Sequence, residues 1–134
     1  IKNTLKEVPA EQTILAAPFF TRIWKETPKA ASDDVEAAAE DYVPYELTSQ
    51  ASSMEESWNM VSENGAEASW SEEDGQYYAE YVNGGETYKV WLEDTESMEL
   101  RLKAASESKL AGMAFWKLGL EQSRIWDTIL KYMN

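Results

Sequence analysis

Two short apolar runs near opposite ends of the chain constrain its fold most strongly. Residues 13–17 (TILAA) and 110–116 (LAGMAFW) are continuously apolar or small rather than alternating, a pattern typical of strands that are covered on both faces, as in parallel sheets. Parallel strands need a long connection between them. Because two strands alone cannot make a sheet that buries both faces, we expect the rest of the sheet to lie on an absent part of a longer parent chain or on a partner molecule.

The segment between the two runs predicts a separate small α+β unit. Residues 25–50 are mostly polar or small, which indicates a loop or a weak helix. Ser52–Glu55 fits a capping box and predicts a helix that ends at Asn64–Gly65. Residues 67–92 carry alternating aromatic segments around the turn signal Asn83–Gly85 and predict an antiparallel meander.

Two further helices are expected on either side of the second apolar run. The acidic segment 93–96 begins the first of them, with Asp94 or Thr95 as the N-cap. The second is expected over residues 121–133. Both have apolar residues at helical spacing, in the first Met98, Leu102 and Ala105, and in the second Ile125, Trp126, Ile129, Leu130 and Met133.

Charge and composition exclude several classes of function. The chain has 25 acidic and 12 basic residues, for a net charge of −13, which disfavours nucleic acid and anionic membranes as partners. It contains no Cys and no His, so disulfides, thiolate chemistry and the usual general base are absent. No apolar run reaches transmembrane length and no signal peptide is present. Because the sequence opens on Ile1 instead of Met, we expect a piece of a longer protein or a processed product.

Three segments carry a family resemblance. Residues 14–24 (ILAAPFFTRIW), 88–103 (YKVWLEDTESMELRLK) and 110–121 (LAGMAFWKLGLE) resemble, in the same order, strand 7, the entry to helix 7, and strand 8 of glycoside hydrolase family 18. The chain looks most similar to the bacterial branch of spore-cortex and cell-wall glucosaminidases, in which SSM (52–54) and W-x-E-x-x-G-Q-Y-Y-x-E-Y (70–81) are also familiar. The likeness weakens over residues 25–47.

The resemblance implies a fold. The family has a (β/α)8 TIM barrel with its site at the carboxyl ends of the strands. This chain would be its C-terminal fragment, an α/β piece with an inserted α+β domain. Residues 1–27 would be the strand-7 region, residues 28–92 the insertion, and residues 93–134 helix 7, strand 8 and helix 8.

The resemblance also implies a reaction. Enzymes of this family hydrolyse β-1,4-linked N-acetylglucosamine polymers, here cortex or cell-wall peptidoglycan before chitin, by a retaining mechanism in which the substrate's own acetamide is the nucleophile. The acid residue belongs to a D-x-x-D-x-D-x-E motif on strand 4, which this chain lacks. Asp33, Asp34 and Glu36 lie together without a preceding strand, and we interpret them as solvated charges. We therefore expect no catalytic residue, metal or cofactor in the chain, and no activity from it alone.

The residues that match the family motifs give a candidate substrate-binding set. Trp116, at the end of strand 8, would be the apolar floor beneath a sugar ring; the alternative is a Trp packed inside the barrel. Arg22 would bind sugar hydroxyls or a carboxylate, or else form a surface salt bridge. Phe20 replaces the usual Tyr and lacks its hydroxyl. Trp24, Tyr88 and Trp91 would form a cleft wall, unless they pack within the insertion.

The remaining aromatic and acidic residues have simpler interpretations. We expect Tyr77, Tyr78, Tyr81, Trp58 and Trp70 in the core of the insertion and Trp126 in a helix core. Glu93 and Asp94 are interpreted first as helix-capping residues and second as cleft residues.

The implied partners are an N-acetylglucosamine-containing polysaccharide and the missing N-terminal part of the barrel. Exposed apolar strands, with Ile14, Leu15, Met113 and Phe115, predict a dimer or a swapped assembly of the fragment. The location implied is the cell wall or spore envelope outside a bacterium. Two alternatives remain: a non-catalytic glycan-binding or envelope protein with the same fold, and a free-standing α+β interaction module without a role in sugar binding.

Overall fold

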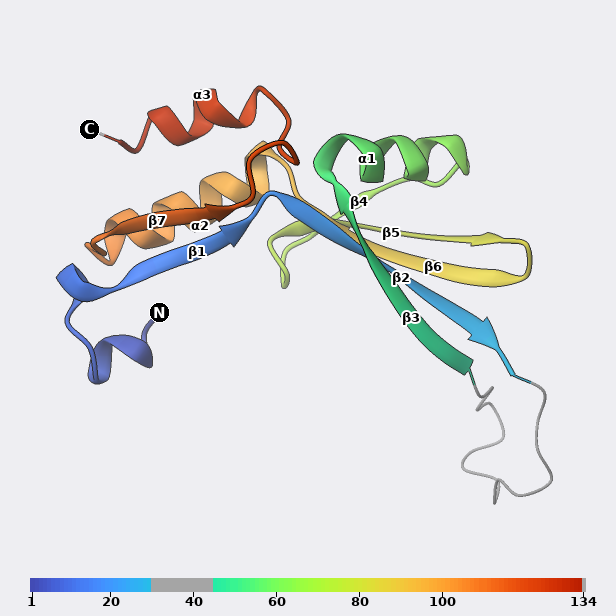
Figure 1. Ribbon diagram of the computed structural model, residues 1–134, viewed down its shortest axis with the longest axis horizontal. Coiled ribbons are helices and arrows are strands. Elements are labelled where there is room, and N and C mark those ends of the chain that lie inside the picture. Colours follow the sequence, from blue (N-terminus) through green and yellow to red (C-terminus); the bar gives the residue numbers. More distant parts are fainter. Residues whose placement is uncertain (30–44, 134) are drawn as a thin grey trace, which may run out of the picture.

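The computed structural model describes residues 1–29 and 45–133 and contains a parallel strand pair beside an antiparallel sheet (Figure 1). Strand β1 (Ile14–Pro18) pairs in parallel with β7 (Gly112–Trp116), from Ile14 opposite Gly112 to Pro18 opposite Trp116. The two apolar runs are therefore parallel strands, as their composition predicted. Two short 3-10 helices, Thr4–Lys6 and Ala10–Gln12, precede β1.

Two helices cover one face of the parallel pair. Helix α2 (Thr95–Glu107) begins at the N-cap Asp94, whose carboxylate accepts hydrogen bonds from the backbone N–H groups of Glu96 and Ser97. Helix α3 (Ile125–Leu130) is shorter than the predicted 121–133. The apolar residues that form the core between these helices and the strands are Ala17, Phe19, Met54, Met98, Leu102, Ile125 and Ile129. Leu130 and Met133 are exposed, so burial stabilises only the middle of the predicted helix.

The second unit is a five-stranded antiparallel sheet in the order β3-β2-β6-β5-β4. Its strands, in that order, are Tyr45–Ser53, Phe20–Pro28, Glu86–Leu92, Gln76–Asn83 and Ser69–Ser71. The meander predicted over residues 67–92 is confirmed as β4, β5 and β6. The loop or weak helix predicted over residues 25–50 is wrong for its described residues, because 25–28 belong to β2 and 45–50 to β3; residues 30–44, including Asp33, Asp34 and Glu36, lie outside the described residues.

Helix α1 (Met54–Glu63) covers one face of this sheet. Its capping box is one residue further along than predicted: Ser53 is the N-cap and Glu56 its reciprocal partner, and the helix ends at Asn64 as expected. The core under α1 contains Ile23, Val61, Ala79, Tyr81, Val90 and Leu92, with Trp58 and Tyr77 packed against it. Trp70 meets Tyr77 edge to face at 5.2 Å.

The two units meet where β1 runs into β2 at the fully buried Phe19 (Figure 1). The parallel pair with α2 and α3 lies on one side of this junction and the antiparallel sheet with α1 on the other. The expected domain border at residues 27/28 falls inside β2, which pairs with β3 from Phe20 onward and with β6 from Ile23 to Glu26. The border expected at 92/93 coincides with the end of β6.

Candidate functional site

A small hollow lies at the junction of the two units, next to the carboxyl end of β1. Its volume is about 190 Å³ and its lining residues are Pro18, Phe20, Thr21, Arg22, Trp24, Gln76, Trp91 and Glu93. Pro18 is paired in register with Trp116, so the exposed indole of Trp116, 69% accessible, stands at the same end of the parallel pair. The hollow therefore combines the carboxyl end of the parallel pair with one face of the antiparallel sheet.

Strand alternation selects which side chains face this hollow. Successive residues of a strand point to opposite faces, so Phe20, Arg22 and Trp24 share one face of β2, while Thr21 and Ile23 point to the face that packs on α1. Trp91 of β6 is on the same face as Trp24, because Trp24 is paired with Lys89, two residues from Trp91. No helix in the described part of the chain contributes a core residue on this face, which we call the open face.

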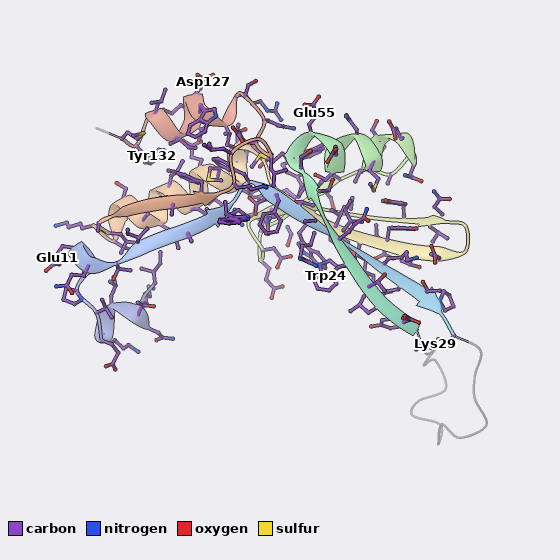
Figure 2. The ribbon with its side chains drawn as sticks, in the orientation of Figure 1. Glu11, Trp24, Lys29, Glu55, Asp127 and Tyr132 are labelled. Carbon is purple, nitrogen blue, oxygen red and sulfur yellow. The ribbon has the colours of Figure 1, made fainter. Side chains whose placement is uncertain are left out.

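A hydrogen bond and a ring contact fix the Trp91 indole, and a cation contacts the Trp24 indole. The Trp91 Nε1–H donates to Asp74 Oδ2 at 3.0 Å, and its ring lies 4.9 Å from the ring of Tyr78. The Trp24 ring has the Arg22 guanidinium carbon 5.8 Å from its centroid, within the range of a cation–π contact. The Thr21 hydroxyl donates to the Trp91 carbonyl at 2.7 Å, which ties β2 to β6 beneath the hollow. Figure 2 shows Trp24 on the sheet.

Arg22 is a cation without a carboxylate partner among residues 1–29 and 45–133. Its Nε and Nη2 both donate to Ser49 Oγ, at 3.2 and 2.8 Å. The salt bridge considered as an alternative from the sequence is therefore not observed in this part of the chain. The remaining N–H groups of the guanidinium have no partner among the described residues. The two hydrogen bonds to the Ser49 hydroxyl orient the guanidinium beside the hollow.

Glu93 is the buried charge of the site, with 3% of the residue exposed. Its carboxylate accepts hydrogen bonds from Arg101 Nη2 at 2.7 Å, Gln76 Nε2 at 2.8 Å and Ser97 Oγ at 2.9 Å. Burial raises the pKa of Glu93; Arg101 and Ser97 oppose this shift without reversing it. The capping role belongs to Asp94, whereas Glu93 lines the hollow.

The structure brings together four of the six predicted site residues. Phe20, Arg22, Trp24 and Trp91 line the hollow, and Trp116 stands beside it through its pairing with Pro18. Tyr88 does not belong to this site, because it lies on the face that packs on α1. There its ring stacks on Tyr81 at 5.0 Å and its hydroxyl donates to Glu86 at 2.9 Å.

Besides Thr21, three polar residues of the site were missed from the sequence. Gln76, Ser49 and Asp74 contact the site residues across sequence separations of 17 to 27 residues, and no local pattern marks them. Tyr78 was expected in the core of the insertion but lies half-buried on the open face, paired with Trp91. Its position follows from strand alternation, since Tyr77 and Tyr81 face α1.

Other kinds of site find no support within the described residues. No group of three or more potential metal ligands occurs among residues 1–29 and 45–133. None of the helices in that part of the chain has the length and hydropathy to cross a membrane.

Solved structures show where this fold occurs. A chitinase from Chromobacterium violaceum superposes with a TM-score of 0.75 at 16% identity, over 98% of this chain and 36% of the chitinase. The spore cortex-lytic enzyme SleL of Bacillus megaterium gives 0.75 at 20% identity, over 99% of this chain and 28% of SleL. A class V chitinase mutant from Nicotiana tobaccum in complex with NAG4 gives 0.67 at 13% identity, over 96% and 36%. The chain thus spans well under half of each relative.

The sequence itself supports the same relationship. No curated protein matches the chain. The family model described as "Glycosyl hydrolases family 18" matches residues 1–121, which include both parallel strands, the whole antiparallel sheet and all lining residues of the hollow. The chain belongs to family 18 of the glycosyl hydrolases.

Proposed function

We propose that the chain is the C-terminal part of a family 18 (β/α)8 barrel. In this assignment β1 is strand 7, α2 is helix 7, β7 is strand 8 and α3 lies in the place of helix 8. The parallel pairing of β1 with β7 and the packing of α2 and α3 behind it support the assignment. The antiparallel sheet with α1 is then an insertion, which begins near Phe20 instead of residue 28 and ends at residue 92.

The proposed role of the chain is to bind the glycan. The observation that carries it is the hollow at the carboxyl end of β1, lined by two indoles and an Arg without a carboxylate partner among the described residues. Aromatic rings pack on the apolar faces of sugars while nearby polar groups bind hydroxyls. Trp116 would form the floor, and Phe20, Arg22, Trp24 and Trp91 one wall. The substrate would be a β-1,4-linked N-acetylglucosamine polymer, in peptidoglycan or spore cortex before chitin.

The proposed chemistry is the substrate-assisted retaining hydrolysis that distinguishes this family. The wall and floor would hold a distorted sugar with its acetamide beneath the anomeric carbon, while a Glu on an upstream strand protonates the leaving oxygen. The D-x-x-D-x-D-x-E motif does not occur in these 134 residues. We therefore propose that the chain binds glycan without cleaving it, and that the parent enzyme acts outside the cell on a bacterial wall or spore envelope.

Titration of the chain with N-acetylglucosamine oligomers, followed by Trp fluorescence and calorimetry, tests the role in binding. Trp24→Ala and Trp91→Ala should each weaken binding about three- to tenfold, because each variant loses one aromatic contact with the glycan. Tyr88→Phe is the matched control, because Tyr88 lies on the opposite face, and it should bind like the wild type. Absence of binding at any oligomer length would rule out the proposal, and turnover by the chain alone would rule out an upstream acid.

A non-catalytic glycan-binding or envelope protein with the same fold is the second candidate. It is favoured by a hollow that offers aromatic and hydrogen-bonding groups. Among the described residues that line it, the one carboxylate, Glu93, is already bound by three donors. The two candidates differ in the parent protein: hydrolysis with retained anomeric configuration supports the enzyme, whereas binding without turnover supports the second candidate.

A further inference from the structure

A groove, which we call the α2 groove, runs along the solvent side of helix α2. Its volume is about 700 Å³, within the range of ligand sites. Its lining residues come from three places: α2 itself, Trp70 and Tyr77 of the antiparallel sheet, and Tyr132 after α3. It shares no lining residue with the hollow at the junction. The α2 groove is therefore a separate surface, to which both units of the molecule contribute.

Helical spacing sets the direction and length of this groove. Met98, Leu102 and Ala105 are buried, and residues on the opposite side of the helix, from Glu96 to Glu107, line the groove. This stretch of helix is about 16 Å long, which is the length of about five residues of extended peptide. In the barrel proposed above the helices form the outer ring, so this side of α2 would face outward.

Apolar and aromatic groups in the α2 groove remain open to solvent. Leu100 is 47% exposed in the middle of the helix. It lies beside the turn between β4 and β5, because its Cδ1 would be 3.0 Å from a Cβ on Gly75. Trp70 and Tyr77 are half-buried at the sheet end of the groove, and Tyr132 is half-buried on the side towards α3 (Figure 2). These groups can receive one aliphatic side chain of a partner.

The lining of the α2 groove is also negatively charged. Three Glu residues and one Lys line it, so three negative charges and one positive charge give a net charge of −2. Lys103 pairs with Glu107 at 3.9 Å, whereas Glu96 and Glu99 form no ion pair among residues 1–29 and 45–133. The Tyr132 hydroxyl donates to Glu99 Oε1 at 3.2 Å, which orients this carboxylate without neutralising it. A cationic partner would therefore be attracted to the groove.

Charge and apolar surface together decide the kind of partner. The chain has a net charge of −13, so carboxylates alone would attract cations to any part of its surface. In the α2 groove, Glu99 and Glu96 lie one and four residues before the exposed Leu100 on the same helix. A segment that alternates basic and aliphatic residues matches this arrangement, because Lys and Arg have an apolar stem and a charged end. A neutral or anionic ligand would leave both carboxylates without a counter-charge.

We propose that the α2 groove is a docking site for an extended basic segment of a partner protein, about five residues long. An aliphatic side chain of the segment packs on Leu100 and Trp70, and the Lys or Arg residues beside it pair with Glu96 and Glu99. Because the groove is separate from the hollow at the junction, the partner and a glycan bind to the chain at the same time.

A labelled pentapeptide of alternating Lys and Leu, with both ends blocked, is the probe for this docking site. Fluorescence anisotropy at about 0.15 M salt should show saturable binding of one peptide per chain. Leu100→Ser should weaken binding about fivefold, because the aliphatic contact is lost. Val82→Ser is the matched control, since Val82 is an exposed apolar residue outside the groove, and it should bind like the wild type. The same peptide with Ser in place of Leu should bind clearly more weakly.

A second pair of variants tests the charge. Glu99→Gln removes one carboxylate but keeps an oxygen that accepts from the Tyr132 hydroxyl, and it should weaken peptide binding about two- to fivefold. Glu55→Gln changes the net charge equally at an exposed position on α1 (Figure 2) and should bind like the wild type. Equal losses from both changes would mean that the peptide is attracted to the acidic surface in general, which would overturn the docking site.

NMR of the side chains locates the bound peptide. The Leu100 methyl signals and the Trp70 indole N–H signal should shift on addition of the peptide, while the Trp91 indole N–H signal stays unchanged. N-acetylglucosamine oligomers should not displace the peptide. Absence of saturable peptide binding, a Leu100→Ser variant that binds like the wild type, or displacement by the oligomers would overturn the docking site. None of these results would affect the proposed binding of glycan at the junction, which the oligomer titration tests separately.

Discussion

At the scale of single residues, Glu93 connects the two units of the molecule. Its carboxylate is bound by Gln76 of β5 and by Ser97 and Arg101 of α2. Its backbone N–H donates to the Thr21 hydroxyl, and its carbonyl accepts from the Trp58 indole. A buried carboxylate is tolerated because each of these groups has a partner. Removal of Arg101, the cation among these partners, therefore leaves an uncompensated charge at the junction.

Arg101→Met removes that compensation and should destabilise the chain by about 2–3 kcal/mol at pH 7. This is less than the roughly 3–5 kcal/mol typical of a fully buried pair, because 27% of the Arg101 side chain is exposed. Loss of Arg101 raises the pKa of Glu93 further. Below the ordinary pKa of 4.5, Glu93 is protonated in both the folded and unfolded states, so burial of its charge does not lower stability. The destabilisation grows as pH rises from 4.5 to the raised folded-state pKa and is complete above it.

Urea unfolding at pH 7 and pH 4 measures this effect. The destabilisation by Arg101→Met should be clearly smaller at pH 4. Lys103→Met is the control on the same helix, since Lys103 is exposed and its ion pair with Glu107 is long at 3.9 Å; it should change stability by less than about 0.5 kcal/mol. A loss from Arg101→Met that is equal at both pH values would mean that lost packing, not charge, explains it.

The site residues show what could be predicted from the sequence at this scale. Phe20, Arg22 and Trp24 are spaced two apart, so strand alternation alone places them on one face. The same rule excludes Tyr88 from the face of Trp91, three residues away, and the expectation for Tyr88 failed for this reason. Gln76 reaches Glu93 across 17 residues, a contact that depends on how β5 meets α2 and that no local spacing encodes.

At the scale of elements, β3 shows how pairing overrides composition. Its sequence YELTSQASS is polar and small, and it predicted a loop or a weak helix. The strand forms because each of its residues, from Tyr45 to Ser53, lies opposite a residue of β2. Strand preference depends on such context. The meander β4–β5–β6, by contrast, has alternating aromatic residues and an Asn-Gly-Gly turn, and this local pattern was enough to predict its strands.

The beginning of α1 depends on one hydroxyl. The Ser53 Oγ accepts from the Glu56 backbone N–H at 3.2 Å, while the Glu56 carboxylate accepts from the Ser53 backbone N–H at 3.1 Å. Ser53→Ala should destabilise the chain by about 1 kcal/mol, the usual value for loss of an N-cap. Thermal unfolding followed by circular dichroism measures it. Ser62→Ala, an exposed position on the same helix, is the control and should be nearly neutral; equal effects of both changes would contradict the capping role.

At the scale of the whole molecule, one face of the parallel pair is covered, and the other is bare of contacts from residues 1–29 and 45–133. Met113 and Phe115 pack against the core beneath α2 and α3, and Leu15 is half-buried. Of the four apolar residues expected to be exposed, only Ile14, at 62%, belongs to the bare face. Ala16, Ala114 and Trp116 share that face by alternation. In the barrel proposed above, the remaining strands would cover it.

The 134-residue chain by itself should therefore associate through this bare face. Its net charge of −13 opposes association, so the effect should appear with rising protein and salt concentration. Ile14→Lys places a charge on the face and should return the chain to a monomer, with little change in stability because the site is exposed. Val82→Lys, at an equally exposed apolar position on β5, should associate like the wild type. Sedimentation equilibrium measures the mass; a wild-type monomer at every concentration, or an Ile14→Lys variant that still associates, would contradict this role of the β1–β7 face.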